Sequence, residues 1–156
     1  MNSTVLKTLP FTIAAFVFVY QAVQQMRQDL IYNRAQAELS FWGQGNYQPM
    51  ADTVRDTGDA IDSLLQERPA HPDFLTLEAA YFSWLAFWSK RPGAREELSL
   101  RAVSSQNRAV SARPAHQKSW SKVAAYASRT ADGQRLVDES SKRIETLKMT
   151  PRAGRL

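Results

Sequence analysis

The chain contains no cysteine, and this absence removes several kinds of chemistry at once. Without thiols it can form no disulfide, carry no cysteine nucleophile and offer no thiolate ligand to zinc. It has two histidines, His71 and His116, and neither stands in an HxxxH or HxxE spacing, so the sequence gives little support to a zinc site. We therefore expect no cofactor and no metal ion, and a capping or solvent-exposed role for both histidines.

Motifs for phosphate binding and nucleophilic catalysis are also missing. Gly43 and Gly45 are not followed by the GK[ST] of a phosphate-binding loop, and no GxSxG nucleophile turn occurs. Four aspartates at three- and four-residue steps do place carboxylates on one helical face, and paired carboxylates can act as acid and base. Because that face lies opposite apolar residues, a solvated face is the better interpretation, and we expect no enzymatic activity. These residues are Asp52, Asp56, Asp59 and Asp62.

Alternating runs rich in valine, isoleucine and threonine are absent, and the recurring pattern has helical spacing. The sequence therefore predicts an all-α fold. A first helix is expected to end at Trp42, before a break formed by glycines 43 and 45, Asn46 and Pro49. The third predicted helix should begin at Asp73, which would be its N-cap. A turn is expected over 89–97, after that helix. The predicted helices after the first cover about 50–67, 73–88, 94–113, 117–130 and 133–148.

Charge is distributed unevenly along the chain. Residues 1–89 carry five Lys/Arg and nine Asp/Glu (net −4), residues 90–129 carry nine and two (net +7), and residues 130–156 carry six and four (net +2), which together give the net charge of +5. Such asymmetry indicates an electrostatic contact. The contact is either internal, with the acidic stretch at 52–67, or with an anionic partner, and plain solvation of the charges is the alternative to both.

The amino-terminal region holds the one long uncharged run. Nineteen residues without a charge lie between Lys7 and Arg27, and as a helix they would span ~28 Å, close to the thickness of a bilayer core. We expect a single transmembrane anchor, with a cleaved signal peptide and a buried soluble helix as the alternatives. A short tail with one lysine favours a cytoplasmic amino terminus and a periplasmic body. The expected anchor residues are Phe11, Ile13, Phe16, Val17, Phe18, Val19 and Tyr20.

Two segments begin with the same letters, RPAH. RPAHPDFLTLEAAYFSW at 68–84 and RPAHQKSWSKVAAYASR at 113–129 share eight of seventeen residues at an offset of 45. Each stands between two expected helices, so we interpret the duplication as one of helix packing. Its large and small residues resemble the tetratricopeptide repeat, although the period there is ~34. The expected domains are a membrane anchor at 1–27, a helical-hairpin (tetratricopeptide-like) domain at 28–148 and a tail at 149–156.

The whole layout resembles a family of small accessory proteins of bacterial exopolysaccharide biosynthesis, the VpsP-like proteins. The resemblance rests on the short anchor, an acidic helix that ends in a proline turn, the aromatic helix with FSWLAFWS, and a later RPxxxxxW element. It covers about residues 5–130. It implies an inner-membrane protein that assists polymerisation or export of a surface polysaccharide without catalysis.

The predicted function is that of a non-enzymatic, membrane-anchored adaptor of the cell envelope, single-pass in the bacterial inner membrane. Its partners would be membrane lipid, through the amino-terminal helix, and an envelope protein; nucleic acid is not expected. The alternatives are a subunit of a secretion or pilus machine and a basic domain that binds anionic lipid or nucleic acid. The candidate partner-binding residues are Arg91, Arg95, Arg101, Lys118, Lys122 and Arg129.

Overall fold

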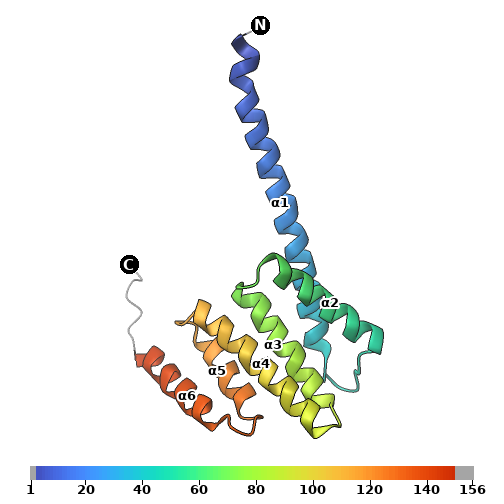
Figure 1. The fold of residues 1–156 in the computed structure, drawn as a ribbon, viewed down its shortest axis with the longest axis vertical. Coiled ribbons are helices and arrows are strands. Elements are labelled where there is room, and N and C mark those ends of the chain that lie inside the picture. Colours follow the sequence, from blue (N-terminus) through green and yellow to red (C-terminus); the bar gives the residue numbers. More distant parts are fainter. Residues whose placement is uncertain (1–2, 150–156) are drawn as a thin grey trace.

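The computed structural model of the protein describes residues 3–149, with side chains from residue 14 onward. Within that part the chain forms six α-helices and no strand, which confirms the predicted all-α class (Figure 1). The helices are α1 (Ser3–Phe41), α2 (Ala51–Glu67), α3 (Pro72–Trp88), α4 (Pro92–Ala112), α5 (Gln117–Ala127) and α6 (Gln134–Met149).

Prolines set the starts of two helices, and they correct two details of the prediction. Pro72 is the first residue of α3, so the N-cap is His71 and not Asp73. Pro92 likewise opens α4, and the turn expected over 89–97 is therefore shorter than predicted. Proline is suited to the first helical position because its missing N–H would have no partner there and its φ is already helical.

The two RPAH segments form the same turn. Arg68, after α2, has φ −138° and ψ 78°, and Arg113, after α4, has φ −136° and ψ 66°. In each turn the histidine N–H donates to the arginine carbonyl, over 3.1 Å from His71 and 3.0 Å from His116. The repeated letters therefore mark repeated helix-to-helix connections, from α2 to α3 and from α4 to α5.

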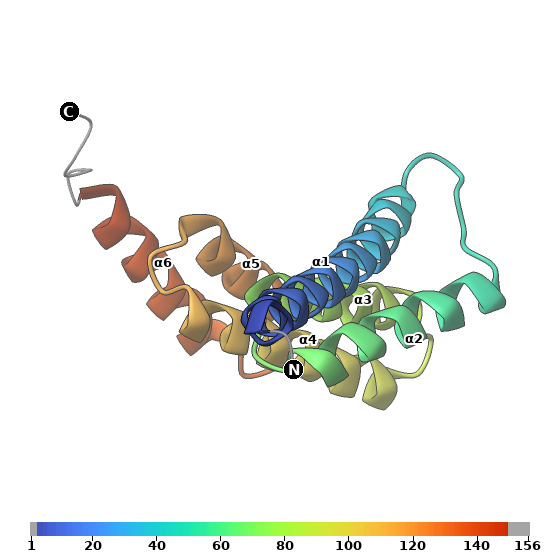
Figure 2. The same ribbon diagram turned by 90° about the horizontal axis from the view of Figure 1, so that it is seen from above.

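The helices pack as an open array. Helix α3 lies most extensively against α4, α4 also meets α5, and α6 packs on α5, while α1 and α2 cover the other side of α3. Figure 2 shows α2 and α6 at opposite ends of this array. The main apolar core lies between α1, α2 and α3, and its buried members are Ala35, Leu39, Trp42, Ile61, Leu64, Phe74 and Leu77.

Helix α4 is buried more than its polar sequence suggested. Its buried residues are mostly small, and they include two valines and one long polar side chain, Gln106, which is fully buried; the set is Ser99, Ala102, Val103, Ser105, Gln106, Ala109 and Val110. The Gln106 side-chain amide donates to the Ser119 carbonyl over 3.3 Å. Small residues let α3 and α5 approach α4 closely.

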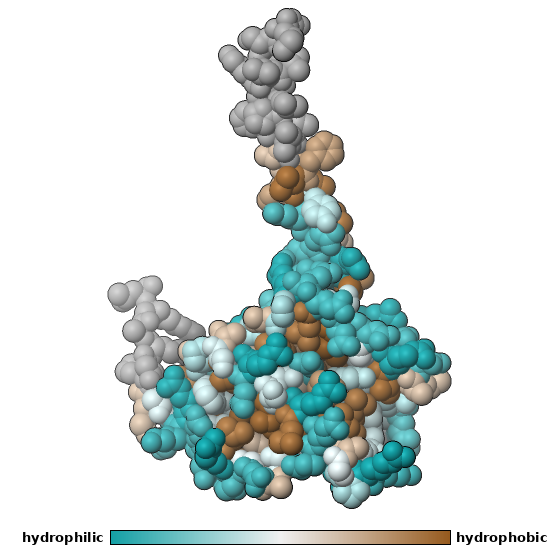
Figure 3. Space-filling view, in the orientation of Figure 1, coloured by the Kyte–Doolittle hydropathy of each residue, from teal (hydrophilic) through white to brown (hydrophobic). Residues whose placement is uncertain are grey.

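Helix α1 belongs partly to the core and partly to solvent. Its last turns supply core residues, among them Ala35 and Leu39, whereas the part before residue 24 projects from the body (Figures 1 and 3). The helix leaves the body where Gln28 donates to the Glu67 carboxylate over 2.5 Å and Arg68 donates to the Gln25 side chain over 2.8 Å. The projecting part therefore begins beside the first RPAH turn.

The expected anchor residues lie on this projecting part. Phe16, Val17, Phe18, Val19 and Tyr20 are all at least half exposed. Phe11 and Ile13 lie outside the residues whose side chains the structure describes. Within the described part of the chain, no helix is both long enough and apolar enough to cross a membrane.

Candidate functional site

The six basic residues predicted to bind a partner do not lie on one surface. Arg95 and Arg129 line the same cavity, whereas Arg101 and Lys122 each line another. Arg91, before α4, and Lys118, in α5, are exposed side chains. The structure therefore brings together one pair of the six.

Arg101 and Lys122 each make their own local contacts. The guanidinium carbon of Arg101, on α4, lies 4.0 Å from the centre of the Phe82 ring, on α3. This is a cation–π contact between the two helices. Lys122 lies beside Asp73. Burial lowers the pKa of Lys122 below its ordinary value, and the negative charge of Asp73 opposes that change. Arg101 thus packs on α3, whereas Lys122 lines a separate cavity with Asp73.

Lys122 lies four residues after Lys118, and Arg129 lies seven residues after Lys122, a spacing that predicts one shared helical face. In the structure Arg129 does not share that face. Helix α5 ends at Ala127, and the following amides turn back to carbonyls of its last turn. The turn directs Arg129 towards α3, where its Nη1 donates to the Ser83 hydroxyl over 2.8 Å. Because α5 ends at Ala127, the Arg129 guanidinium lies against α3 and away from the face of α5 that carries Lys118 and Lys122.

The cavity around this pair, which we call the arginine cavity, has a volume of about 250 Å³. Arg95 donates to the Ser89 carbonyl over 2.8 Å. Among the described residues neither guanidinium of the pair is in an ion pair with a carboxylate. Two positive charges and two hydroxyls therefore converge on one space, which suits an anion. The lining residues are Ser83, Ala86, Phe87, Arg95, Ser99 and Arg129.

A second cavity, the aromatic cavity, adjoins the first through Phe87. Its volume is about 470 Å³. The rings of Trp84 and Trp88 are stacked, with centres 5.5 Å apart and planes 27° apart, and Phe87 meets Trp84 edge-on at 5.8 Å. We call the two cavities together the Phe87 surface. The lining residues of the aromatic cavity are Gly43, Gly45, Asn46, Tyr47, Gln48, Trp84, Phe87 and Trp88.

The loop between α1 and α2 gives the aromatic cavity a fixed wall. One carboxylate oxygen of Glu38 accepts hydrogen bonds from Trp42 Nε1 over 3.0 Å and from the Tyr47 hydroxyl over 2.5 Å. Gly43 has φ +76°, and a Cβ placed there would lie 2.3 Å from Cη2 of Trp84. A glycine is therefore needed at this position both for its backbone angle and for the close approach of the tryptophan ring.

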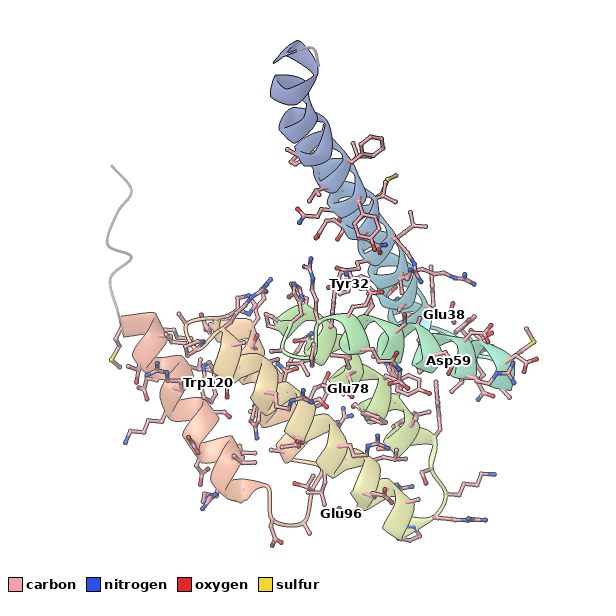
Figure 4. All side chains as sticks on the ribbon, turned by 45° about the horizontal axis from the view of Figure 1, so that its top comes forward. Tyr32, Glu38, Asp59, Glu78, Glu96 and Trp120 are labelled. Atoms are coloured by element: carbon pink, nitrogen blue, oxygen red, sulfur yellow. The ribbon has the colours of Figure 1, made fainter. Side chains whose placement is uncertain are left out.

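A larger cavity, of about 480 Å³, lies between α1 and α2 and is lined by Glu38 and Asp59 among others (Figure 4). Glu38 is already occupied by the two hydrogen bonds of the loop. The four aspartates of α2 are exposed, as predicted for a solvated face. Among the described residues no group of three or more histidine, aspartate or glutamate side chains could hold a metal ion.

The two histidines contribute to the turns through their backbones. His71 and His116 are the N-cap residues of α3 and α5, and neither side chain makes a cap hydrogen bond. The His71 ring lies 4.1 Å from that of Phe74, and His116 Nδ1 lies 2.7 Å from the Ser119 hydroxyl. Their backbone carbonyls accept from the N–H groups of Leu75 and Ser119, bonds that any residue at these positions could make, so neither histidine side chain has the expected capping role.

The Phe87 surface was not predicted as a site. The spacing in α3 gives two apolar faces, one with Phe74, Leu77, Tyr81, Trp84, Leu85 and Trp88 and the other with Leu75, Ala79, Phe82 and Ala86, and it predicts that both are core. Trp84 and Trp88 do contribute to packing beside the core cluster. Phe87, however, falls on neither apolar face of the helix. An aromatic residue that lies off both faces was the signal in the sequence that could have indicated an exposed site.

Comparisons of this chain with protein-family models, with curated proteins and with solved structures gave no match.

Proposed function

We propose that the chain is a non-enzymatic, membrane-anchored accessory protein of the bacterial cell envelope. The observation that carries the proposal is the projecting part of α1. Phe16, Val17, Phe18 and Val19 are successive residues, each 50–74% exposed. Because a helix turns by about 100° per residue, four successive side chains point in nearly all directions around its axis. A helix with apolar side chains on every side is suited to a lipid environment rather than to a groove on one protein face.

The sequence supplies the length that the proposal needs. The uncharged run between Lys7 and Arg27 has nineteen residues, enough to cross a hydrocarbon core of ~30 Å with the help of flanking polar residues. Tyr20 and the following glutamines would lie near the headgroups. The helical body, with hairpins that we regard as divergent tetratricopeptide-like units, would then stand on the periplasmic side of the inner membrane.

The body has the properties of an adaptor. It is an open array of helices whose Phe87 surface is at the end of α3, and the loop after α1 lines it. The amino-terminal part of α1 projects from the body near the start of α3, at the opposite end of α3 from the Phe87 surface (Figure 1). A bound partner would therefore be held away from the bilayer. The likeness to exopolysaccharide accessory proteins favours a place in polysaccharide assembly or export, beside an envelope protein partner.

The first test is of the anchor. Replacing Val17 and Val19 by aspartate should release the chain from membranes, because each charge costs ~2.5–3.5 kcal/mol at the centre of a spanning helix. The measurement is the fraction that stays in the membrane pellet after alkaline carbonate extraction. Met50→Asp is the matched control, since Met50 is 75% exposed outside α1. Extraction of the unmutated chain by carbonate would refute the anchor.

A fusion of alkaline phosphatase after Leu156 tests on which side of the membrane the body lies. An active phosphatase is expected, since the enzyme is active in the periplasm; an inactive one would place the body in the cytoplasm.

One observation favours a second candidate function, contact with anionic lipid. Basic residues gather at the end of the body from which α1 projects. Arg68 donates to Gln25 on α1, and Arg108 donates to the carbonyl of Pro69 over 2.8 Å. Arg113 lies beside them in an exposed ion pair with Asp73 at 2.7 Å. These guanidinium groups would lie at headgroup level if α1 enters the bilayer.

Binding to anionic vesicles should therefore depend on these residues and on salt. Each basic residue near an anionic surface contributes ~1 kcal/mol, so Arg68→Gln with Arg108→Gln should weaken binding of the anchor-disrupted chain about tenfold or more. Arg135→Gln, on α6, is the control for a general loss of charge. Vesicle flotation at low and high salt measures the effect. Binding that does not change with salt or with the double substitution excludes this second function.

A further inference from the structure

We propose that the Phe87 surface binds an acidic saccharide, a sugar chain that carries carboxylates. The first observation is the exposure of its rings. Phe87 is 67% exposed and Tyr47 is 40% exposed, although each could be buried at a gain of free energy. Exposed aromatic clusters on a small body mark binding sites. The flat carbon–hydrogen face of a sugar ring is an apolar surface that can stack on such exposed rings.

The second observation is the polarity of the rim. Asn46 and Gln48 line the aromatic cavity, and in the described part of the chain their side-chain amides have no hydrogen-bond partner. An amide offers a donor and an acceptor together. Sugar hydroxyls also donate and accept, so two free amides beside a set of rings match a saccharide better than an apolar peptide segment.

The third observation is the charge of the adjoining cavity. Arg95 and Arg129 face the arginine cavity without a carboxylate partner among the described residues, and Phe87 forms part of the wall of both cavities. A ligand that stacks on Phe87 can therefore place an anionic group against the two guanidinium groups. Arginine is the residue best suited to bind a carboxylate through two parallel hydrogen bonds. A uronic acid residue combines the ring face, the hydroxyls and the carboxylate.

The surface is also held in shape before a ligand arrives. Trp42 is buried and packs on Trp88, with ring centres 5.0 Å apart, and the hydrogen bond to Glu38 fixes Tyr47. The aromatic cavity, at about 470 Å³, lies within the usual range of small-ligand sites, ~300–1,000 Å³. Binding would therefore cost little ordering of side chains.

The test is a titration of the purified full chain with a tetramer of galacturonic acid. Its neutral methyl ester and tetraglutamate are the comparison ligands, all at one ionic strength, and the readouts are calorimetry and tryptophan fluorescence. We expect the acidic tetrasaccharide to bind, the neutral ester to bind at least about tenfold more weakly, and tetraglutamate not to compete. Equal binding of the neutral ester would overturn the role of the arginines. Tighter binding of tetraglutamate would overturn the saccharide assignment and make the surface a docking site for acidic protein segments.

Variants locate the binding. Phe87→Ala should weaken binding of the acidic tetrasaccharide about tenfold or more, and Arg129→Gln should remove the preference over the neutral ester. Leu100→Ala and Arg135→Gln are the matched controls, an exposed apolar residue and an exposed arginine of the same body, and should bind as the unmutated chain does. Each variant is first compared by its melting curve. Unchanged binding in both site variants, or no binding by the unmutated chain, overturns the proposal.

This inference deepens the proposed envelope function and rests on it for the source of the saccharide. The two can fail separately. The titration uses a free saccharide and needs no membrane, whereas carbonate extraction reports the anchor and needs no saccharide. A chain that binds the tetrasaccharide but is extracted by carbonate would keep the site and lose the anchor.

Discussion

Trp42→Ala is expected to lower the free energy of unfolding by about 3–5 kcal/mol, the usual loss for a large aromatic side chain in a core. Trp42 is 2% exposed and its ring lies 5.0 Å from Trp88 and 5.9 Å from Tyr81. It therefore joins α1 to α3 at the end of the apolar core. Its substitution also removes the indole hydrogen bond to Glu38. Chemical denaturation of the full chain, followed by circular dichroism, measures the loss.

Trp120→Ala is the matched control for this substitution. A large aromatic side chain at the end of the RPxxxxxW element predicts a core position for Trp120. The structure instead leaves it partly exposed, with its indole N–H donating to the Pro114 carbonyl over 2.8 Å. Trp120 belongs to α5 and lies far from Glu38 (Figure 4). Its removal should cost about 1–2 kcal/mol, within the common range for single substitutions. Equal losses for the two tryptophans would contradict a core centred between α1, α2 and α3.

Gly43→Ala is expected to have the second largest effect, because it adds two costs at one position. A residue other than glycine at φ +76° is strained by about 1–2 kcal/mol. The new methyl group would also lie 2.3 Å from the Trp84 ring, which must move and disturb the aromatic cavity. We expect a loss of stability of about 2–4 kcal/mol, measured by chemical denaturation, and weaker binding of any ligand at the Phe87 surface.

Gly45→Ala separates the two costs. Gly45 also has a positive φ, +54°, but a Cβ there meets nothing within 4 Å. It should therefore show the backbone strain alone, with the near-ultraviolet circular dichroism of the tryptophans unchanged. If both alanine variants had the same stability and the same spectrum, the close approach of the loop to Trp84 would be refuted.

Much of the fold could be predicted because proline and glycine punctuate the chain. Gly43 and Gly45, which adopt a positive φ, lie in the predicted break after the first helix. Prolines 72 and 92 lie at predicted breaks as well, although each is the first residue of a helix rather than part of the turn before it. Helical spacing of apolar residues indicated the rest. The sequence does not fix a helix end that no proline or glycine marks. The helix predicted over 117–130 is three residues longer than α5, because nothing in its sequence marks Ala127 as the end.

The site could not be predicted in the same way. Arg129 reaches α3 because the chain turns after α5, and Arg95 comes from α4, so the pair depends on the packing of three helices. Local spacing carries no information on such contacts, since the residues are 34 positions apart in the sequence. The burial of Gln106 was missed for a similar reason, because a polar side chain becomes a core residue only through the neighbour that accepts its hydrogen bond.

The division of α1 between core and solvent has a mechanical consequence. The helix is continuous over 39 residues, and no glycine or loop lies between the exposed Val23 and the buried Gln28. Sharp kinks in helices lie at proline, glycine or bulges, and neither proline nor glycine occurs in this stretch, so it transmits tilt and rotation to the body. Any torque on its amino-terminal half would therefore turn the whole body, and with it the Phe87 surface, through the same angle, so that α1 acts as a lever arm.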